Sequence, residues 1–327
     1  MKTLRTAVVG VGHLGRQHAR IHAALAAEGK SEFVAVCDTN EETARAVADE
    51  RGVRRTVDWH GLVGEVDAVS LATPTESHAE IACALLEAGV HVLVEKPISR
   101  TLDEADQMIE AARRGGATLM VGHLERFNPA LVALKPHVKH PVYFEIHRVG
   151  QFTARSLDID VVLDLMIHDL DIVLWLVGHD VEVTDVRGVG LPVLTNRVDA
   201  ANARIEFATG AVANITASRV GTEKIRKMRF FQPHDYIAVD YATRYASISS
   251  LAPPSSTGSW PGVQVRHLDI VDVEPLRTEI ELFLEAAREG SPAPVTGEEG
   301  RHALALAERL LARIHEHPII ANMKMQF

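Results

Sequence analysis

The first 122 residues alternate short apolar runs with longer segments of helical spacing. The runs are continuous in valine, leucine and alanine, which is typical of strands buried on both faces of a parallel sheet. The longer segments place apolar residues three and four positions apart, as amphipathic helices do. Strands are expected at 5–11, 32–38, 66–74, 90–97 and 117–123, and helices at 13–29, 40–52, 76–89 and 101–116. This succession predicts an α/β domain with a doubly wound parallel sheet over residues 1–122.

The pattern changes in the second half of the chain. From 181 to 250, polar and apolar residues alternate in runs that are separated by glycine or polar turns, which predicts an antiparallel meander. The Pro/Gly/Ser-rich stretch 251–262 is expected to be a loop, and two helices are expected at about 275–289 and 297–315. We therefore expect residues 123–327 to form an α+β domain with a large open antiparallel sheet.

Composition restricts the class of function. The chain has 327 residues, and 34 basic against 44 acidic side chains give a net charge of −10. This balance argues against a nucleic-acid or membrane partner. Cys37 and Cys83 lack metal-ligand spacing and fit a reducing cytoplasm. Neither a signal peptide nor an apolar run of membrane-spanning length is seen, so a cytoplasmic protein is expected.

A glycine-rich loop connects the first predicted strand to the first predicted helix. Gly10, Gly12 and Gly15 form a G-x-G-x-x-G pattern, whose glycines permit a tight turn and a close approach of the backbone to a pyrophosphate. Asp38 ends the second strand, where a carboxylate accepts hydrogen bonds from ribose hydroxyls and repels a 2′-phosphate. The pattern therefore predicts NAD rather than NADP as cofactor. The alternative is a plain glycine turn with a surface aspartate.

Two loops, 72–78 and 95–97, follow the third and fourth strands, where open α/β sheets bind ligands. The Lys96 ammonium could hold a substrate hydroxyl and stabilise the alkoxide that forms as hydride leaves. A lysine that pairs with Glu95 or lies in solvent is an equal alternative. The candidate cofactor-binding residues are Gly10, Gly12, His13, Leu14, Gly15, Asp38, Thr73, Pro74, His78, Glu95 and Lys96.

Segment 160–176 is apolar, yet it carries several carboxylates and a histidine. On a helix, one stripe is polar and another is apolar; the polar stripe is Asp160, Asp164, His168 and Asp171. His168 is a natural general base near neutral pH, and Asp164 could orient it. A solvated face with a structural histidine is the alternative. Metal binding by Asp164 and His168 has no supporting motif, so no metal is expected.

Several segments, in order along the chain, resemble the Gfo/Idh/MocA family of nucleotide-dependent sugar oxidoreductases. They are GVGHLG, CDTN, LATPTESHAEIACALLEAGVHVLVEKPIS, VGHLERFNPA, DLMIHDLDIVLWLVG and PVTGEEGRHALALAERLL. The resemblance implies a Rossmann domain followed by a larger domain whose open sheet commonly forms an oligomer interface, in a homodimer or homotetramer. It also implies that Lys96 and His168 are the catalytic pair, with Asp164 beside them.

One departure from the family pattern concerns the substrate. Many members carry glycines just before this helix and two residues before the histidine, where this chain has Asp160-Val161-Val162 and Met166. The form RSLDIDVVLDLMIHDLDI instead resembles the branch that oxidises the 3-hydroxyl of UDP-N-acetylglucosamine, ahead of a transamination that supplies 2,3-diamino sugar for lipid A. An inositol or free-sugar dehydrogenase, or a non-catalytic dinucleotide-binding sensor, remains an alternative.

A nucleotide-sugar substrate requires donors for its diphosphate, a role that suits arginine. Arg155 lies directly upstream of the 160–176 segment, and Arg226 lies in a predicted strand, where an ordinary exposed residue is the favoured interpretation. The candidate substrate-binding residues are Asn128, His147, Arg155, Asp164 and His168.

Overall fold

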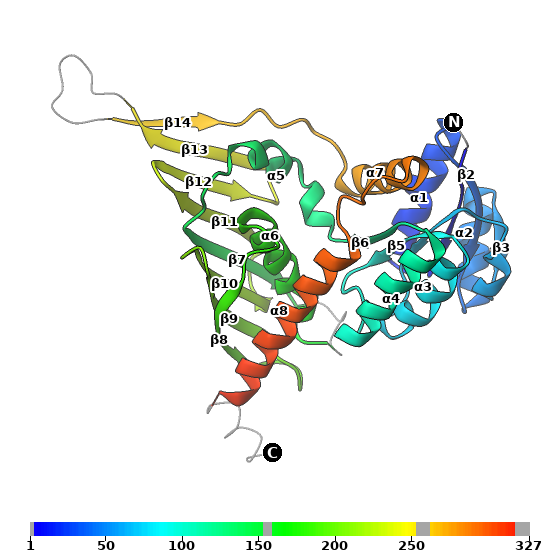
Figure 1. Cartoon of the computed structure of the whole chain (residues 1–327), viewed down its shortest axis with the longest axis horizontal. Coiled ribbons are helices and arrows are strands. Elements are labelled where there is room, and N and C mark those ends of the chain that lie inside the picture. The colour runs from blue at the N-terminus through cyan, green and yellow to red at the C-terminus, as the bar shows by residue number, and fades with distance from the viewer. Residues whose placement is uncertain (1–2, 153–158, 253–261, 318–327) are drawn as a thin grey trace. The chain divides into compact units, whose positions relative to one another are not determined.

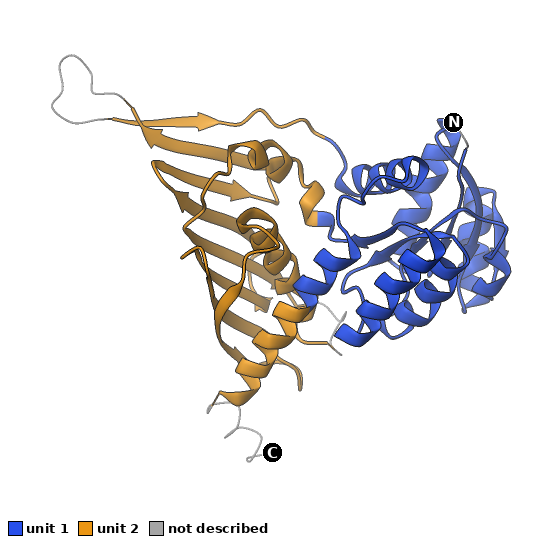
Figure 2. Ribbon diagram, viewed as in Figure 1, with its two compact units in different colours: residues 1–124, 273–304 blue, residues 125–272, 305–327 orange. Residues whose placement is uncertain are grey.

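A computed structural model describes residues 3–152, 159–252 and 262–317 (Figure 1). The chain divides into two compact units, residues 1–124 with 273–304 and residues 125–272 with 305–327 (Figure 2). The chain first passes from one unit to the other after residue 124, and the boundary expected from the sequence follows residue 122. Residues 273–304, however, return to the first unit, because the helix at 275–289 packs on it rather than on the second sheet. Arg155 and most of the 251–262 stretch lie outside the described residues.

The first unit is built on a six-stranded parallel sheet in the order β3-β2-β1-β4-β5-β6. The reversal of strand order between β1 and β4 is the point at which doubly wound sheets bind dinucleotides. The prediction of this fold is confirmed, and only the short β3 was not predicted. The strands are β1 (Arg5–Val9), β2 (Glu32–Cys37), β3 (Arg54–Thr56), β4 (Ala68–Leu71), β5 (His91–Glu95) and β6 (Leu119–Gly122).

Helices cover this sheet, and their ends follow local sequence signals. The side chain of Asn40 caps α2 and that of Thr101 caps α4, and both helices end at a glycine of positive φ. The helices are α1 (Gly15–Ala27), α2 (Glu41–Arg51), α3 (His78–Glu87), α4 (Leu102–Gly115) and α7 (Pro275–Glu289), with the 3-10 turns η1 (Trp59–Leu62), η2 (Thr75–Ser77) and η3 (Leu124–Phe127).

The second unit is built on an eight-stranded sheet in the order β14-β13-β12-β11-β7-β10-β9-β8. The open sheet is as expected, but it is mixed, because β7 and β10 pair in parallel. Neither β7 nor β14 was predicted. The strands are β7 (Tyr143–Gln151), β8 (Val183–Leu191), β9 (Ala200–Phe207), β10 (Val212–Gly221), β11 (Ile225–Gln232), β12 (Asp235–Asp240), β13 (Tyr245–Leu251) and β14 (Val263–His267).

Helices pack on one face of this sheet (Figure 1). A Cβ atom at Gly188 in β8 would lie 2.4 Å from Leu310 Cδ1, so the last helix packs closely on the strand at this glycine. The elements on this face are α5 (Pro129–Leu134), η4 (Lys135–His137), η5 (Val162–Met166), α6 (Ile167–Val177) and the last part of α8 (Gly297–Glu316). Only residues 305–316 of α8 belong to the second unit. Across residues 3–152, 159–252 and 262–317, no helix combines the length and apolar character needed to cross a bilayer.

Candidate functional site

The glycine loop has the geometry of a dinucleotide-binding turn. Gly10 has φ +82°, and a Cβ atom there would lie 2.6 Å from the carbonyl oxygen of Ala72. A Cβ atom on Gly15 would lie 1.8 Å from the carbonyl oxygen of Gly10, so only glycine allows α1 to begin here. Gly12 differs, since a Cβ atom there would meet no protein atom within 4 Å. The loop therefore keeps open space above Gly12, which fits the pyrophosphate of a dinucleotide.

The start of α1 and the end of β2 complete this cradle. His13 and Leu14 are exposed, and no side chain caps the N-terminus of α1, an end that favours a negatively charged group such as a phosphate. Asp38 accepts hydrogen bonds from the backbone N–H groups of Val11 and Asn40, both at 2.9 Å. These bonds hold a half-buried carboxylate beside the glycine loop. Its remaining lone pairs fit the ribose hydroxyls of NAD.

His78 connects the two loops beyond the carboxyl ends of β4 and β5. Its Nε2 lies 3.0 Å from the carbonyl oxygen of Thr73, and its Nδ1 lies 3.1 Å from that of Pro97. The ring is 1% exposed, and burial lowers its pKa. His78, which was a candidate cofactor-binding residue, is thus buried, and its hydrogen bonds connect the two loops. Thr73 and Pro74 lie at the turn into η2, and the Ser77 hydroxyl donates to Thr73 Oγ1 at 2.8 Å.

Lys96 follows directly after β5, and its side chain is half-buried. Its backbone N–H donates to Glu95 Oε2 at 3.3 Å, while Glu95 Oε1 lies 3.0 Å from His18 Nε2 on α1. The Glu95 carboxylate is therefore a buried anchor of the Lys96 backbone.

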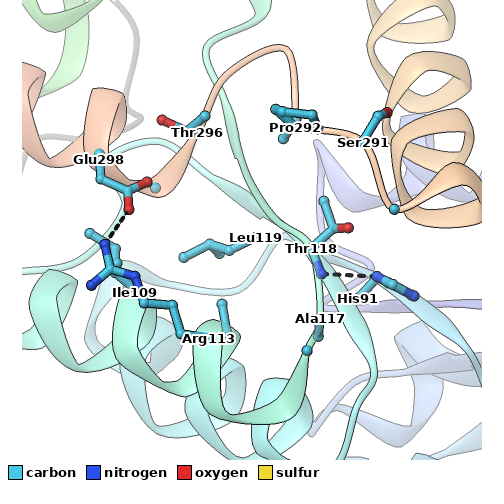
Figure 3. A pocket seen from close by; sticks show the side chains of 15 residues that line it. His91, Ile109, Arg113, Ala117, Thr118, Leu119, Ser291, Pro292, Thr296 and Glu298 are labelled. Atoms are coloured by element: carbon cyan, nitrogen blue, oxygen red, sulfur yellow. Dashed lines mark hydrogen bonds and ion pairs between the residues drawn. The ribbon is translucent and has the colours of Figure 1, made fainter.

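A separate hollow of about 430 Å³ lies at the opposite, amino end of β5 and β6 (Figure 3). His91 and Thr118 border it, and an ion pair between Arg113 and Glu298, at 2.9 Å, closes one side. Because ligands of doubly wound sheets bind at the carboxyl ends of the strands, this hollow is not the cofactor site.

In the second unit, Asp164 and His168 are both half-buried. Asp164 lies in η5, a π-helical turn that leads directly into α6, and His168 is the second residue of α6. A π turn accommodates an extra residue, so it rotates the side chains before it relative to those after it. The regular helix expected over 160–176 is thus interrupted, and π turns of this kind occur frequently at functional sites.

The rest of the predicted polar stripe has structural partners. The Asp160 carboxylate accepts from the backbone N–H of Val198 at 2.8 Å. Asp171 is 1% exposed and binds Arg126 through two hydrogen bonds of 2.6 and 2.8 Å. The expectation that Asp171 faces a cleft with His168 is therefore wrong. It failed because a buried arginine remote in sequence supplies the partner of Asp171.

A second buried ion pair anchors the start of α6. Arg148, on β7, binds Asp169 through hydrogen bonds of 2.7 and 2.8 Å and Glu125 through one of 2.8 Å. Burial raises the pKa of Glu125, but Arg148 outweighs it and holds that pKa below its usual range. Sequence reasoning missed Arg126 and Arg148, because their partners are remote along the chain.

The remaining substrate candidates are dispersed. Asn128 is 7% exposed; it caps α5 by accepting from the N–H of Ala130, and its amide donates to the carbonyl oxygen of Tyr241. His147 is exposed on the sheet face opposite to that of Arg148, so the register of β7 separates it from His168 within one chain. Arg226 is the cross-strand neighbour of Arg148, and its guanidinium lies 3.7 Å from Glu125.

No group of three or more His, Cys, Asp or Glu side chains within 3–152, 159–252 and 262–317 is arranged to hold a metal ion. Lys96 belongs to the first unit, and Asp164 and His168 belong to the second. Each unit thus presents its own set of reactive groups, with the dinucleotide cradle in the first.

Comparisons with known proteins agree with both units. A family model described as oxidoreductase family, NAD-binding Rossmann fold, matches residues 4–123, and a GFO/IDH/MocA C-terminal domain model matches residues 103–231. The UDP-N-acetylglucosamine 3-dehydrogenase of Acidithiobacillus ferrooxidans is 41% identical over 305 residues, which are 93% of this chain and 95% of that protein. A solved structure of that enzyme has a TM-score of 0.88 at 39% identity and covers 96% of this chain and 98% of its own.

More distant relatives share the fold. A myo-inositol 2-dehydrogenase of Thermotoga maritima is 28% identical, with 93% of this chain and 94% of that protein covered. Levoglucosan dehydrogenase in complex with NADH and levoglucosan has a TM-score of 0.85 at 20% identity, over 96% of this chain and 98% of that one. The chain therefore belongs to the Gfo/Idh/MocA family of oxidoreductases, and its first domain is an NAD-binding Rossmann domain.

Proposed function

We propose that the protein is an NAD-dependent dehydrogenase that oxidises the 3-hydroxyl of UDP-N-acetylglucosamine to the 3-keto sugar. The observation that carries this proposal is the 41% identity to a UDP-N-acetylglucosamine 3-dehydrogenase over 93% of the chain. The relatives named for inositol are less similar, at 28% for the Thermotoga maritima enzyme. The replacement of the family's glycines by Val161, Val162 and Met166 supports the same choice.

The proposed chemistry divides the work between the two units. His168 takes the proton of the sugar hydroxyl, and Asp164, one turn earlier, orients its ring. The Lys96 ammonium holds the hydroxyl oxygen and stabilises the negative charge that develops on it. NAD, when bound, supplies the acceptor for the hydride of the sugar carbon. Gly10, Gly12, Gly15 and Asp38 hold that cofactor.

The diphosphate of the substrate is expected to need an arginine outside the glycine loop. We propose Arg155 for this role, since it directly precedes the segment of Asp164 and His168 in the sequence. Arg155→Ala should then raise the apparent KM for UDP-N-acetylglucosamine and leave that for NAD unchanged. A variant in which both KM values stay normal would remove Arg155 from the site.

The biological setting is part of the same proposal. The product suits a subsequent transamination toward a 2,3-diamino sugar of lipid A, and we place the enzyme in the cytoplasm. We further propose a homodimer or homotetramer through the uncovered face of the second sheet. Three aromatic side chains cluster there, with ring centroids 5.9 Å apart for Tyr143 and Phe231 and 5.1 Å apart for Phe231 and Tyr236. Phe231 is 42% exposed, which favours burial against a second copy.

The decisive experiment is NADH formation with a panel of UDP-sugars, free inositol and free glucose. We expect UDP-N-acetylglucosamine to give the highest kcat/KM. If inositol or glucose is oxidised as well as any UDP-sugar, the nucleotide-sugar assignment fails. Absence of NADH formation with every sugar, together with intact NAD binding, would favour a dinucleotide-binding sensor.

Two variants test the catalytic roles. Lys96→Ala and His168→Ala should each lower turnover by roughly 10²-fold or more, with NAD affinity little changed. His140→Ala, which removes an exposed histidine of the second unit, is the matched control and should keep normal turnover. Near-normal turnover in both test variants would refute the assignment.

A further inference from the structure

One buried acid of the first unit has no partner. Glu279, on α7, is 0% exposed, and neither of its carboxyl oxygens has a hydrogen-bond partner among the described residues. Buried Asp169, Asp171 and Asp199 each bind a donor or a cation. A carboxylate without such partners is strongly disfavoured in a protein interior, so the exception needs a physical reason.

On α1 and β5, both of which the structure describes in full, no lysine or arginine is buried next to Glu279. Helix α7 packs against α1 and β5 (Figure 1), whose buried titratable groups are His18 and His22 on α1 and Glu95 on β5. Burial, together with His18, lowers the pKa of His22 to about 3, so His22 is neutral. The charged residues at the rim of the α1–α7 contact pair with one another, namely Arg20 with Glu274, Arg277 with Glu28, and Lys30 with Glu28 and Glu281.

These surroundings favour the protonated form of Glu279. Burial, and then the neighbouring Glu95 carboxylate, raise the pKa of Glu279 well above its ordinary value. A protonated carboxyl group is a hydrogen-bond donor through its O–H. Glu279 therefore brings a donor, rather than a second negative charge, to the vicinity of Glu95.

The Glu95 carboxylate has a contact on each oxygen, and one of these contacts is with the backbone of Lys96. One of its oxygens lies 3.0 Å from His18 Nε2, and the other accepts from the N–H of Lys96 at 3.3 Å. A Cβ atom at Gly122 would lie 3.3 Å from Glu95 Oε1, so β6 passes close to this carboxylate. A shift of the Glu95 carboxylate would therefore be transmitted to Lys96.

The count of donors and acceptors leaves a place for the Glu279 proton. If His18 donates from Nε2 to Glu95, its Nδ1 is an acceptor, and this buried nitrogen has no partner among the described residues. A protonated Glu279 would supply a buried O–H from α7, which packs against α1. Since the structure contains no direct hydrogen bond between them, one bridging water would satisfy both groups.

We propose that Glu279 is a positioning residue for Lys96: the Glu279 carboxyl group carries a proton and donates a hydrogen bond, through one bridging water, to the buried His18–Glu95 pair. This inference rests on the proposed function, in which Lys96 acts on the sugar hydroxyl. Loss of the proton would bring a second negative charge into the buried surroundings of the Glu95 carboxylate. The repulsion would displace Glu95, and with it the backbone of Lys96.

Infrared spectroscopy tests the proton without reference to activity. In protein with isotope-labelled glutamate, the wild type at neutral pH should show the carbonyl stretch of a buried protonated carboxylic acid, and Glu279→Gln should lack it. The exposed control Glu285→Gln, on the same helix, should retain the band. Absence of the band from the wild type means that Glu279 is ionised and overturns the inference.

Two substitutions test the positioning role. Glu279→Leu removes the donor and should lower kcat roughly tenfold or more with an unchanged KM for NAD, because small misplacements of catalytic groups are costly. Glu279→Gln keeps a neutral donor and should restore most of the lost turnover. Equal turnover in the two variants would overturn the inference. If Glu279→Leu does not fold, as judged by circular dichroism, the comparison of Glu279→Gln with the wild type across alkaline pH decides, since only the wild type should lose activity as Glu279 ionises.

The same experiments separate this inference from the proposed function. If Lys96→Ala keeps normal turnover, the catalytic assignment of Lys96 fails, while the infrared band still reports the Glu279 proton. If Lys96→Ala is inactive and Glu279→Leu is as active as Glu279→Gln, the proposed function stands and the positioning role of Glu279 is refuted.

Discussion

The buried ion pair between Arg148 and Asp169 allows a quantitative test of what holds α6 in place. The Arg148 side chain is 3% exposed and that of Asp169 is 0% exposed, and two hydrogen bonds join them. Arg148→Met removes the cation but keeps an apolar side chain of similar length. It leaves Asp169 buried, and the loss of one partner of a buried pair costs about 3–5 kcal/mol.

The double variant Arg148→Met/Asp169→Leu should recover most of this loss, since replacement of a whole buried pair by apolar groups is often neutral. Glu125, the other partner of Arg148, has the Arg226 guanidinium 3.7 Å away. The single variant should also be less destabilised at low pH. Burial raises the pKa of Asp169, so protonation of the unpaired acid relieves the penalty, which returns as pH rises.

The assay is urea unfolding followed by the fluorescence of Trp175, which lies in α6, in a Trp59→Phe/Trp260→Phe background. Arg187→Met is the matched control, because Arg187 and its partner Asp185 are on the surface and such pairs contribute about 0–1 kcal/mol. The reasoning is refuted if Arg148→Met costs no more than Arg187→Met, or if the double variant is no more stable than the single one.

Three further predictions concern the first unit. Asp38 should make NAD bind at least about tenfold more tightly than NADP, a difference of only about 1.4 kcal/mol, and equal or tighter NADP binding in a titration would contradict it. Gly12→Ala should weaken NAD binding without changing the melting temperature, since its methyl group meets no protein atom within 4 Å. Gly15→Ala should lower both the NAD affinity and the melting temperature, since its methyl group would overlap the carbonyl oxygen of Gly10. Titration and scanning calorimetry of the two variants measure these changes. Because the pKa of Glu279 is raised in the folded protein, its contribution to stability is fully present below about pH 4.5 and is lost as the pH rises toward its folded-state pKa. In that pH range, the free energy of unfolding of the wild type should fall by up to about 1.4 kcal/mol per pH unit relative to that of Glu279→Gln. Unfolding of both proteins at several pH values measures this difference.

The fold of the first unit was predictable because its signals are local. Strands buried on both faces are continuous apolar runs, and helix ends are marked by adjacent residues such as Asn40, Thr101 and Gly116. The glycine loop was predictable for the same reason, since its conformation depends on glycines within six positions of one another.

The strand β7 was missed because its alternation of polar and apolar residues can be assigned to faces only when the residues that contact it are known. Arg148 occupies an inward position that a soluble strand normally gives to an apolar residue, and its partner Asp169 lies 21 residues away. Without that pairing, the alternation cannot be assigned to a face. A shift of one position exchanges the two faces, so the sequence alone could not separate the exposed His147 from the buried Arg148.

Glu279 was missed for a related reason. In PLRTEIELFLEAARE it resembles the other acids of an amphipathic helix, such as Glu281 and Glu285. Its burial depends on α1 and β5, which come from distant parts of the sequence. The sequence pattern of the helix does not distinguish these three acids, and only the packing of α7 shows that Glu279 is buried while Glu281 is half-buried and Glu285 is exposed.

The acids of segment 160–176 show how one sequence pattern can serve two demands. Buried arginines elsewhere in the second unit need carboxylates, and Asp169 and Asp171 meet that need with 0% and 1% of their surface exposed. The π turn changes the helical register between Asp160 and His168, so their spacing in sequence no longer places them on one face. Asp160 is engaged by the backbone N–H of Val198, and Asp171 is buried against Arg126, so Asp164 and the half-buried imidazole of His168 are the members of the stripe that fit a general base and its partner. The proposed catalytic role therefore falls on these two residues for a reason of surroundings, which their periodicity alone could not supply.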